Sequence, residues 1–317
     1  MYEAKSPVLI IVFNRPNETR AVFDVLRAAR PKRLYVAADA PRMNKPGESE
    51  KCTETLDIFK QVDWPCQVLF KINEHNLGSH TSIPQAIDWF FDNEDEGIVL
   101  EDDCVPSMSF FRYCDELLEK YRNDHRIMWI NGSNIGFQSR EINSTYLYSI
   151  YAISWGWASW RRAWTLFHGN YRTTLEDETL DDILQRNVGS SFMSRFYWRC
   201  IFKYAYTVKN WDFRWLNACW GNGGLACTPT VNMISNIGFG IDGMHGGRLG
   251  DSRGHIQARD ISAEIKGPEM IVPCIKLDNF LNRNLYKISV LSISRTFLAW
   301  RAPWLRNAAR RIQGKQI

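Results

Sequence analysis

Short apolar runs alternate with amphipathic segments through the first hundred residues of the chain. An apolar run of strand length bounded by polar residues is typical of a buried β-strand, whereas apolar residues spaced three and four apart indicate a helix. The predicted strands are 7–13, 33–38, 67–72 and 97–100, and the predicted helices are 17–29, 48–62 and 79–92, the first of them capped by Asn17. This alternation predicts an α/β fold with a mostly parallel central sheet and helices on both faces.

The pattern changes after the fourth strand, where a helix over 108–122 and a strand near 127–131 lead into an aromatic-rich second half. Four tryptophans of that half lie within ten residues of one another. Trp160 and Trp164 have the spacing of one helical face and are interpreted as core side chains. Gly156, between two of the tryptophans, indicates a close backbone approach, such as a shelf for a sugar ring.

The composition bounds the class of protein. The chain has 317 residues and a formal net charge of +4, which is too small to indicate nucleic-acid binding. Its eight cysteines form no Cys-x-x-Cys pair, so we expect reduced and mostly buried thiols. The first apolar run has only the length of a strand and no run reaches the length of a membrane span, so we expect no signal peptide and a cytoplasmic protein.

The end of the chain is basic and aromatic. From Asn279 onward the sequence has eight basic side chains and no acidic one, interleaved with tryptophan, phenylalanine and leucine. This composition favours attachment to an anionic membrane surface, here the inner face of the cytoplasmic membrane. The alternative is a basic helix that packs on the rest of the protein or forms an oligomer contact.

Three carboxylates, those of Glu101, Asp102 and Asp103, follow the apolar run 97–100 directly. Adjacent carboxylates repel one another, and at the carboxyl end of a strand in an open α/β sheet a hard divalent cation can neutralise them. A nucleotide diphosphate is the natural second partner of that cation. We therefore expect a site for Mn²⁺ or Mg²⁺ here; the alternative is a solvated acidic loop.

Further polar residues are expected at or near the same edge. Arg15, Asp39 and His80 each follow a predicted strand or begin a predicted helix. With the acidic motif and with Asp212 and His245, they resemble the GT-A fold glycosyltransferases. Within that group the sequence resembles alpha-1,3-mannosyl-glycoprotein N-acetylglucosaminyltransferase and bacterial HlpA-like sugar transferases, roughly from residue 7 to residue 245. The resemblance implies a Rossmann-like GT-A fold and a UDP-sugar donor.

The resemblance also implies a role for each matching residue. Arg15 follows the first strand as the family's arginine does, Asp39 matches its uracil-binding aspartate, and His80 matches a histidine near the uracil. Glu101 and Asp102 would contact the donor sugar and ribose, and Asp103 would bind the metal. The implied donor-binding residues are thus Arg15, Asp39, His80, Glu101 and Asp102, with Asp103 as metal ligand. For His80, the alternative is an exposed residue at the start of a helix.

Asp212 lies in the run Trp-Asp-Phe-Arg-Trp, which is similar to the family's Trp-Asp-x-x-Trp stretch that supplies the catalytic base. An inverting transfer needs a carboxylate opposite the leaving diphosphate to take the proton of the acceptor hydroxyl. The alternative role of Asp212 is the N-cap of a helix over 213–220. The glycine-rich segment 232–247 resembles a lid over the diphosphate in which His245 or Asp242 contacts metal or phosphate; the alternative is a set of turns.

These residues predict an inverting, metal-dependent transferase. It would move N-acetylglucosamine, or another hexose or N-acetylhexosamine, from a UDP-sugar to a saccharide acceptor, which can be lipid-linked, in bacterial lipopolysaccharide or capsule synthesis. The expected organisation is a nucleotide-sugar-binding half (1–105), a metal- and acceptor-binding half of the same domain (106–262) and a basic tail (263–317). The alternatives are a sugar-phosphate nucleotidylyltransferase, disfavoured because no glycine follows the first strand, and a non-enzymatic membrane-active or binding protein.

Overall fold

The computed structural model describes residues 2–139, 141–169, 174–239, 252–261 and 264–301. Its chain forms two compact units, each made of two segments. Unit 1 consists of Met1–Thr165 and Gly224–Asp278, and unit 2 of Leu166–Gly223 and Asn279–Ile317. The predicted division at residues 105 and 262 is one of function and stays a prediction.

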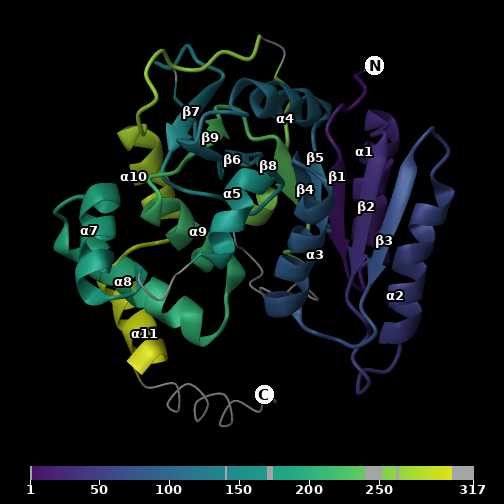
Figure 1. Ribbon diagram of the computed structural model, residues 1–317, viewed down its shortest axis with the longest axis horizontal. Coiled ribbons are helices and arrows are strands. Elements are labelled where there is room, and N and C mark those ends of the chain that lie inside the picture. Colours follow the sequence, from purple (N-terminus) through teal and green to yellow (C-terminus); the bar gives the residue numbers. More distant parts are fainter. Residues whose placement is uncertain (1, 140, 170–173, 240–251, 262–263, 302–317) are drawn as a thin grey trace. The chain divides into compact units, whose positions relative to one another are not determined.

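Unit 1 is built on an eight-stranded sheet with the order β3-β2-β1-β4-β8-β6-β9-β7 (Figure 1). Its strands are β1 (Val8–Val12), β2 (Arg33–Ala38), β3 (Gln67–Ile72), β4 (Glu96–Glu101), β6 (Ile127–Asn131), β7 (Tyr146–Ser149), β8 (Trp157–Trp160) and β9 (Leu225–Pro229). Six of these strands share one direction, and β7 and β8 run against them. A small antiparallel pair, β5 (Cys104–Pro106) and β10 (Ile234–Asn236), completes the unit's strands in the described part of the chain. The predicted α/β class with a mostly parallel sheet is confirmed.

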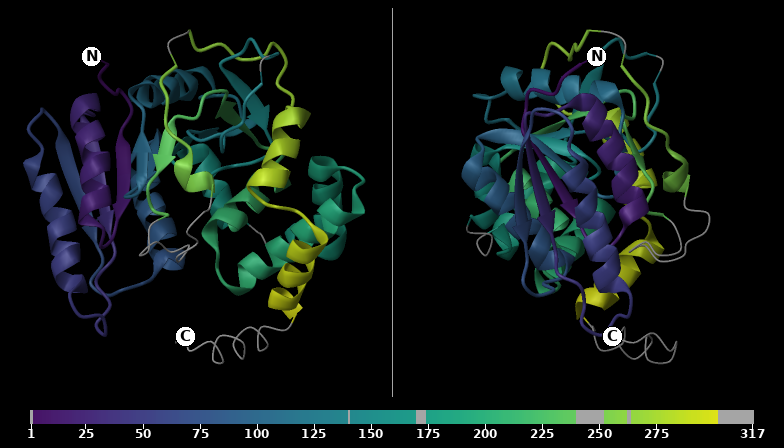
Figure 2. Two further views of the ribbon diagram at one scale, coloured as in Figure 1. Left: turned by 180° about the vertical axis from the view of Figure 1, so that it is seen from behind. Right: turned by 90° about the vertical axis from the view of Figure 1, so that its right-hand side faces the viewer.

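Helices cover both faces of this sheet because successive strand residues point to opposite sides. On one side, Val8 and Ile10 of β1 join a core with Phe23 of α1 (Pro16–Ala29), and α1 packs against α2 (Glu48–Asp57) and α4 (Met108–Lys120). On the other side, the ring centroid of Tyr35 lies 5.0 Å from those of both Trp89 and Phe90 on α3 (Ser79–Asn93). Figure 2 shows α1 and α2 together on one side of the strands.

Two helix predictions are corrected in detail. The helix predicted over 48–62 ends as an α-helix at Asp57 and continues as the 3₁₀-helix η1 (Ile58–Gln61). Asn17 does not cap α1, because the helix already begins at Pro16 and no side chain makes a cap hydrogen bond. Proline has no N–H group and a helical φ, so it is well suited to the first position of a helix.

The tryptophan-rich segment lies in the core of unit 1. Trp157 on β8 stacks on Trp129 of β6 with ring centroids 3.7 Å apart. Trp160 and Trp164 are both buried, as predicted, but they belong to β8 and to the short helix α5 (Arg161–Trp164) instead of one helix. Gly156 has a φ of +59°, and a Cβ there would lie 2.4 Å from Cδ1 of Ile234. The close approach is confirmed, but the group that lies close to Gly156 is the core side chain of Ile234, and the buried Gly156 forms no shelf for a sugar ring.

Unit 2 is helical and includes part of the expected tail. Its helices are α7 (Asp177–Val188), α8 (Phe192–Thr207), α9 (Trp211–Gly221) and α11 (Val290–Arg301). Two more elements, η2 (Thr165–His168) and α10 (Ile275–Asn284), begin in unit 1 and end in unit 2, and η3 (Ser252–His255) lies entirely in unit 1. Trp198 of α8 is fully buried, with its ring 5.0 Å from that of Trp220 and 4.6 Å from that of Tyr286. Because Tyr286 belongs to the expected basic tail, the first part of that tail packs against the core of unit 2.

All eight cysteines are free thiols, and six of them are buried. Among the residues that the structure describes, no helix is long and apolar enough to span a membrane.

Candidate functional site

A cavity of about 470 Å³ lies at the carboxyl ends of β1, β2 and β4 in unit 1. In open α/β sheets this edge is where ligands bind, because the loops that follow the strands diverge there. Its wall comprises Ile11, Val12, Phe13, Asn14, Arg15, Asp39, Arg42, Lys45, Asn76, Gly78, Ser79, Ser82, Ile83, Glu101 and Asp102. The structure thus brings together four of the predicted donor-binding residues, namely Arg15, Asp39, Glu101 and Asp102.

Arg15 joins the two aspartates of the acidic motif. Its Nη1 donates to Oδ2 of Asp103 at 2.7 Å and to Oδ1 of Asp102 at 3.2 Å. The other oxygen of Asp102 accepts from the backbone N–H of Phe13 at 3.2 Å. Arg15 immediately precedes α1, so the end of β1 and the start of α1 are both tied to the end of β4.

The pKa values of Asp102 and Arg15 are both raised in this cluster. Burial, and then the neighbouring charge of Asp103, raise the pKa of Asp102 to about 7, although Arg15 and the N–H of Phe13 act in the opposite direction. Burial alone would lower the pKa of Arg15, but Asp102 and Asp103 raise it above its ordinary value. One guanidinium therefore serves two carboxylates, and the cluster is negative when both are ionised.

The oxygen donors of this cluster fit a hard divalent cation. Mg²⁺ typically binds through one or two carboxylates together with substrate phosphates, and carboxylate oxygens also suit Mn²⁺. The carboxylate of Asp103 lies against backbone, since a Cβ on Gly238 would lie 1.9 Å from its Oδ2, and the N–H of Ile237 donates to the Asp103 carbonyl at 2.8 Å. Within the described part of the chain, no three His, Cys, Asp or Glu side chains form a ready-made metal cage. A bound cation would compete with Arg15 for Asp103.

Asp39 is held by a neighbouring loop. Its carboxylate accepts hydrogen bonds from the backbone N–H groups of Leu77 (3.0 and 3.1 Å) and Gly78 (2.8 Å). The side-chain amides of Asn73 and Asn76 donate to it at 2.9 and 3.2 Å. Asp39 therefore fixes the loop between β3 and α3, and the predicted contact of this carboxylate with uracil stays a prediction.

His80 is exposed on the first turn of α3 and is not part of the cavity wall. Residues of another face of that helix, Ser79, Ser82 and Ile83, line the cavity instead. The count of residues back from the acidic motif could not show which face of the helix His80 would occupy. His245 and Asp242 lie outside the described residues.

Asp212 is in unit 2, on the first turn of α9. It is not the N-cap: α9 begins at Trp211, and the N-cap is Asn210, whose Oδ1 accepts from the N–H of Phe213 at 3.2 Å. Oδ1 of Asp212 accepts from the same N–H at 2.8 Å. Its role as a catalytic base stays a prediction.

Sequence reasoning missed a network in the loop after β2. Glu48 is buried and accepts from Asn14 Nδ2 at 2.9 Å and from the N–H of Arg42 at 2.7 Å. The Arg42 guanidinium also binds this carboxylate and lowers the pKa of Glu48 to about 2. Lys45 lies between these residues and lines the cavity, with no ion pair in the described part of the chain. Arg42 and Lys45 closely follow the predicted strand 33–38, and these two basic residues are the sequence signal that could have identified the network in this loop.

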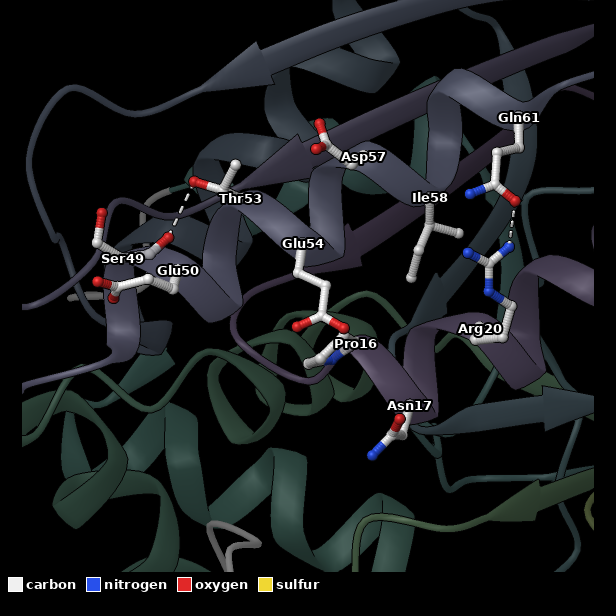
Figure 3. Close-up of a pocket in the computed structure, with 10 residues that line it drawn as sticks. All are labelled: Pro16, Asn17, Arg20, Ser49, Glu50, Thr53, Glu54, Asp57, Ile58 and Gln61. Atoms are coloured by element: carbon white, nitrogen blue, oxygen red, sulfur yellow. Dashed lines mark hydrogen bonds between the residues drawn. The ribbon is translucent and has the colours of Figure 1, made fainter.

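A separate groove of about 600 Å³ lies between α1 and the segment α2–η1 (Figure 3). Its polar groups are partly satisfied by one another: Arg20 donates to Gln61 at 2.7 Å, and the hydroxyl of Thr53 donates to the carbonyl of Ser49 at 3.0 Å. The groove lies along helices, and its wall includes none of the predicted donor-binding or metal-binding residues. We therefore assign the candidate site to the smaller cavity.

No protein-family model and no curated protein matches this sequence. Among solved structures, the chain is similar to HddC from Yersinia pseudotuberculosis (TM-score 0.31, 10% identity, 50% of this chain and 77% of that one). It is also similar to mouse xyloside xylosyltransferase 1 in its apo form (0.32, 11%, 57% and 76%) and to UDP-glucose pyrophosphorylase complexed with UDP-glucose (0.24, 9%, 48% and 59%). At these TM-scores the likeness is too distant to assign a function, which must be argued from the site itself.

Proposed function

We propose that this protein is a metal-dependent glycosyltransferase that uses a nucleotide-sugar donor, with UDP as the nucleotide. The observation that supports this most is the cavity at the ends of β1, β2 and β4, where paired carboxylates stand beside cationic side chains. Carboxylates suit a divalent cation, and cations suit a diphosphate. A nucleotide sugar presents a diphosphate together with hydroxyl groups for the remaining acceptors.

The proposal gives a task to Asp103 and to five residues of the cavity wall. Asp103, supported by Asp102, would hold Mn²⁺ or Mg²⁺, which stabilises the negative charge on the departing nucleoside diphosphate. Arg15 and Lys45 bind phosphate oxygens, while Glu101 and Asp102 accept hydrogen bonds from sugar and ribose hydroxyls. Asp39 keeps the loop before α3 in place, so that the uracil of the donor packs against a fixed wall. His80 lies outside that wall.

Asp212 is proposed as the general base of an inverting transfer. A carboxylate can take the proton of the acceptor hydroxyl as that oxygen attacks the anomeric carbon from the face opposite the diphosphate. We propose a hexose or N-acetylhexosamine donor, with N-acetylglucosamine first, and a saccharide acceptor that can be lipid-linked. Surface-polysaccharide synthesis, with lipopolysaccharide or capsule as the product and a cytoplasmic location for the enzyme, belongs to the same proposal. His245 is the proposed second metal ligand.

The test is release of UDP from UDP-N-acetylglucosamine in the presence of Mn²⁺ and saccharide acceptors. We expect turnover that stops with excess chelator and falls by orders of magnitude in Asp103→Ala. Asp57→Ala, which removes an exposed carboxylate of α2, is the matched control and should leave the rate unchanged. Release of pyrophosphate from UTP and a sugar phosphate would instead identify a nucleotidylyltransferase. Failure of Mn²⁺ and any nucleotide sugar to bind together would refute the proposal.

A further inference from the structure

Four aromatic rings form a continuous row across α8 and α11 in unit 2, which we call the aromatic row. Its members are Phe192 and Phe196 of α8, and Phe297 and Trp300 of α11. The ring centroids lie 6.0 Å apart between Phe192 and Phe196, 5.8 Å between Phe196 and Phe297, and 6.1 Å between Phe297 and Trp300. Figure 1 shows α11 lying against α8. The row is therefore one surface made from two segments that are distant in the sequence.

Much of this surface is open to solvent. Phe192 is 73% exposed and Phe297 is 37% exposed. The same two helices expose three further apolar side chains, Met193 (43%), Val290 (69%) and Leu291 (61%). Single exposed apolar side chains are common on proteins, whereas adjoining exposed apolar side chains are typical of a surface that binds a protein, a ligand or a membrane.

The charge of the two helices selects the kind of partner. Together α8 and α11 carry five basic side chains and no acidic one. Arg199 and Lys203 pair with acidic residues of α7, and the ammonium of Lys203 also lies 5.6 Å from the ring of Trp300. Arg295 is exposed. The sequence that follows α11 adds four basic residues and again no acidic one. The exposed rings of Phe192 and Phe297, together with the exposed Arg295, match the interface of an anionic bilayer.

We infer that the aromatic row is the surface through which unit 2 lies on an anionic membrane. The phenylalanine and tryptophan rings enter the headgroup level, and the basic side chains contact lipid phosphates. This goes beyond the proposed transfer reaction, and it assigns membrane contact to α8 as well as to α11. It does not depend on the transfer reaction, so either proposal can fail alone.

The experiment measures binding of the full-length protein to vesicles of phosphatidylcholine with and without an equal part of phosphatidylglycerol. We expect binding only to the anionic vesicles. Phe192→Ser should weaken it at least about tenfold, as expected from the burial of one large apolar side chain. Arg295→Gln should weaken it about fivefold at low salt and less at high salt. Met43→Ser is the matched control, because Met43 is a fully exposed apolar side chain of unit 1; it should bind as the wild type does.

Other occupants of the row give different results, each of which would overturn the inference. If residues 302–317 cover it, Phe192→Ser lowers the melting temperature without vesicles, and deletion of 302–317 increases vesicle binding. If a second copy covers it, Phe192→Ser converts a dimer into a monomer and leaves vesicle binding unchanged. Equal binding of Phe192→Ser and wild type to anionic vesicles also refutes the membrane role. Circular dichroism confirms that each variant is folded.

Discussion

Replacing Asp278 by asparagine should make unit 1 more stable in alkaline solution and change its response to pH. Asp278 is only 8% exposed, and its Oδ1 accepts from the hydroxyl of Ser149 at 2.5 Å. Burial raises the pKa of this carboxyl from 3.8 to about 7, although the hydrogen bonds from Ser149 and from the N–H of Ile150 act in the opposite direction. Between these two pH values the carboxyl of Asp278 is therefore protonated in the folded protein and ionised in the unfolded chain.

The contribution of this proton to stability depends on pH. The stabilisation is fully present below the unfolded pKa and is lost as the pH rises towards 7. A shift of about three pKa units corresponds to about 4 kcal/mol, of which about 3 kcal/mol falls between pH 5 and pH 8. The side chain introduced by Asp278→Asn would carry no charge at either pH and could keep the bond from Ser149, but its amide group would lack an acceptor, at a cost of about 1–3 kcal/mol.

Thermal unfolding at pH 5 and pH 8 measures this difference. We expect Asp278→Asn to gain about 3 kcal/mol relative to wild type on going from pH 5 to pH 8, or roughly 6–12 °C in Tm for a unit of this size. Asp57→Asn, at an exposed carboxylate, should show no such change. The same Tm difference between Asp278→Asn and wild type at both pH values would refute the reasoning.

Two further predictions concern the proposed reaction. Asp212→Asn keeps an oxygen that can accept from the N–H of Phe213, so we expect unchanged UDP affinity but roughly 10²- to 10⁴-fold slower turnover, and NMR couplings of the wild-type product that show inverted configuration. Retained configuration would contradict this assignment. Arg15→Gln releases both aspartates from their guanidinium, so calorimetry should find Mn²⁺ binding at least about tenfold tighter without nucleotide, and UDP binding weaker. Arg20→Gln on α1 is the control, and unchanged Mn²⁺ affinity in Arg15→Gln would show that the guanidinium does not compete with the metal.

The part of the fold that sequence reasoning anticipated is the part with local causes. β1, β2 and β4 are apolar runs of strand length, and the parallel connections between them place their carboxyl ends at one edge. The position of Asp102 and Asp103 at that edge followed from this alone. The insertion of β8 against the direction of its neighbours β4 and β6 had no local signal, because a four-residue apolar strand does not reveal which way it runs.

The missed parts of the site depend on contacts between distant segments. Glu48 meets Asn14 across 34 positions, and Asp39 meets Gly78 across 39. The second contact also needs Gly78 at a φ of +72°, a conformation that other residues rarely adopt. Neither the partner nor the backbone angle is encoded in a local pattern of apolar and polar residues. His80 shows a further limit, since a spacing taken from a family fixes a position in the sequence but not the face of the helix on which that position lies; its contact with the uracil stays a prediction.

The balance of charge at the cavity favours a metal-dependent reaction. Its wall carries three acidic side chains, Asp39, Glu101 and Asp102, and three basic ones, Arg15, Arg42 and Lys45. Arg42 is already bound to Glu48, and Arg15 to the two aspartates. A diphosphate that entered this cavity alone would meet Lys45 as the one cation of the wall that forms no ion pair in the described part of the chain. A divalent cation at Asp103 would release Arg15 for the phosphates and would itself offset their charge. Without donor, competition from Arg15 for Asp103 weakens metal binding. With donor present, the released Arg15 binds the phosphates, so displacing it from Asp103 would strengthen metal binding.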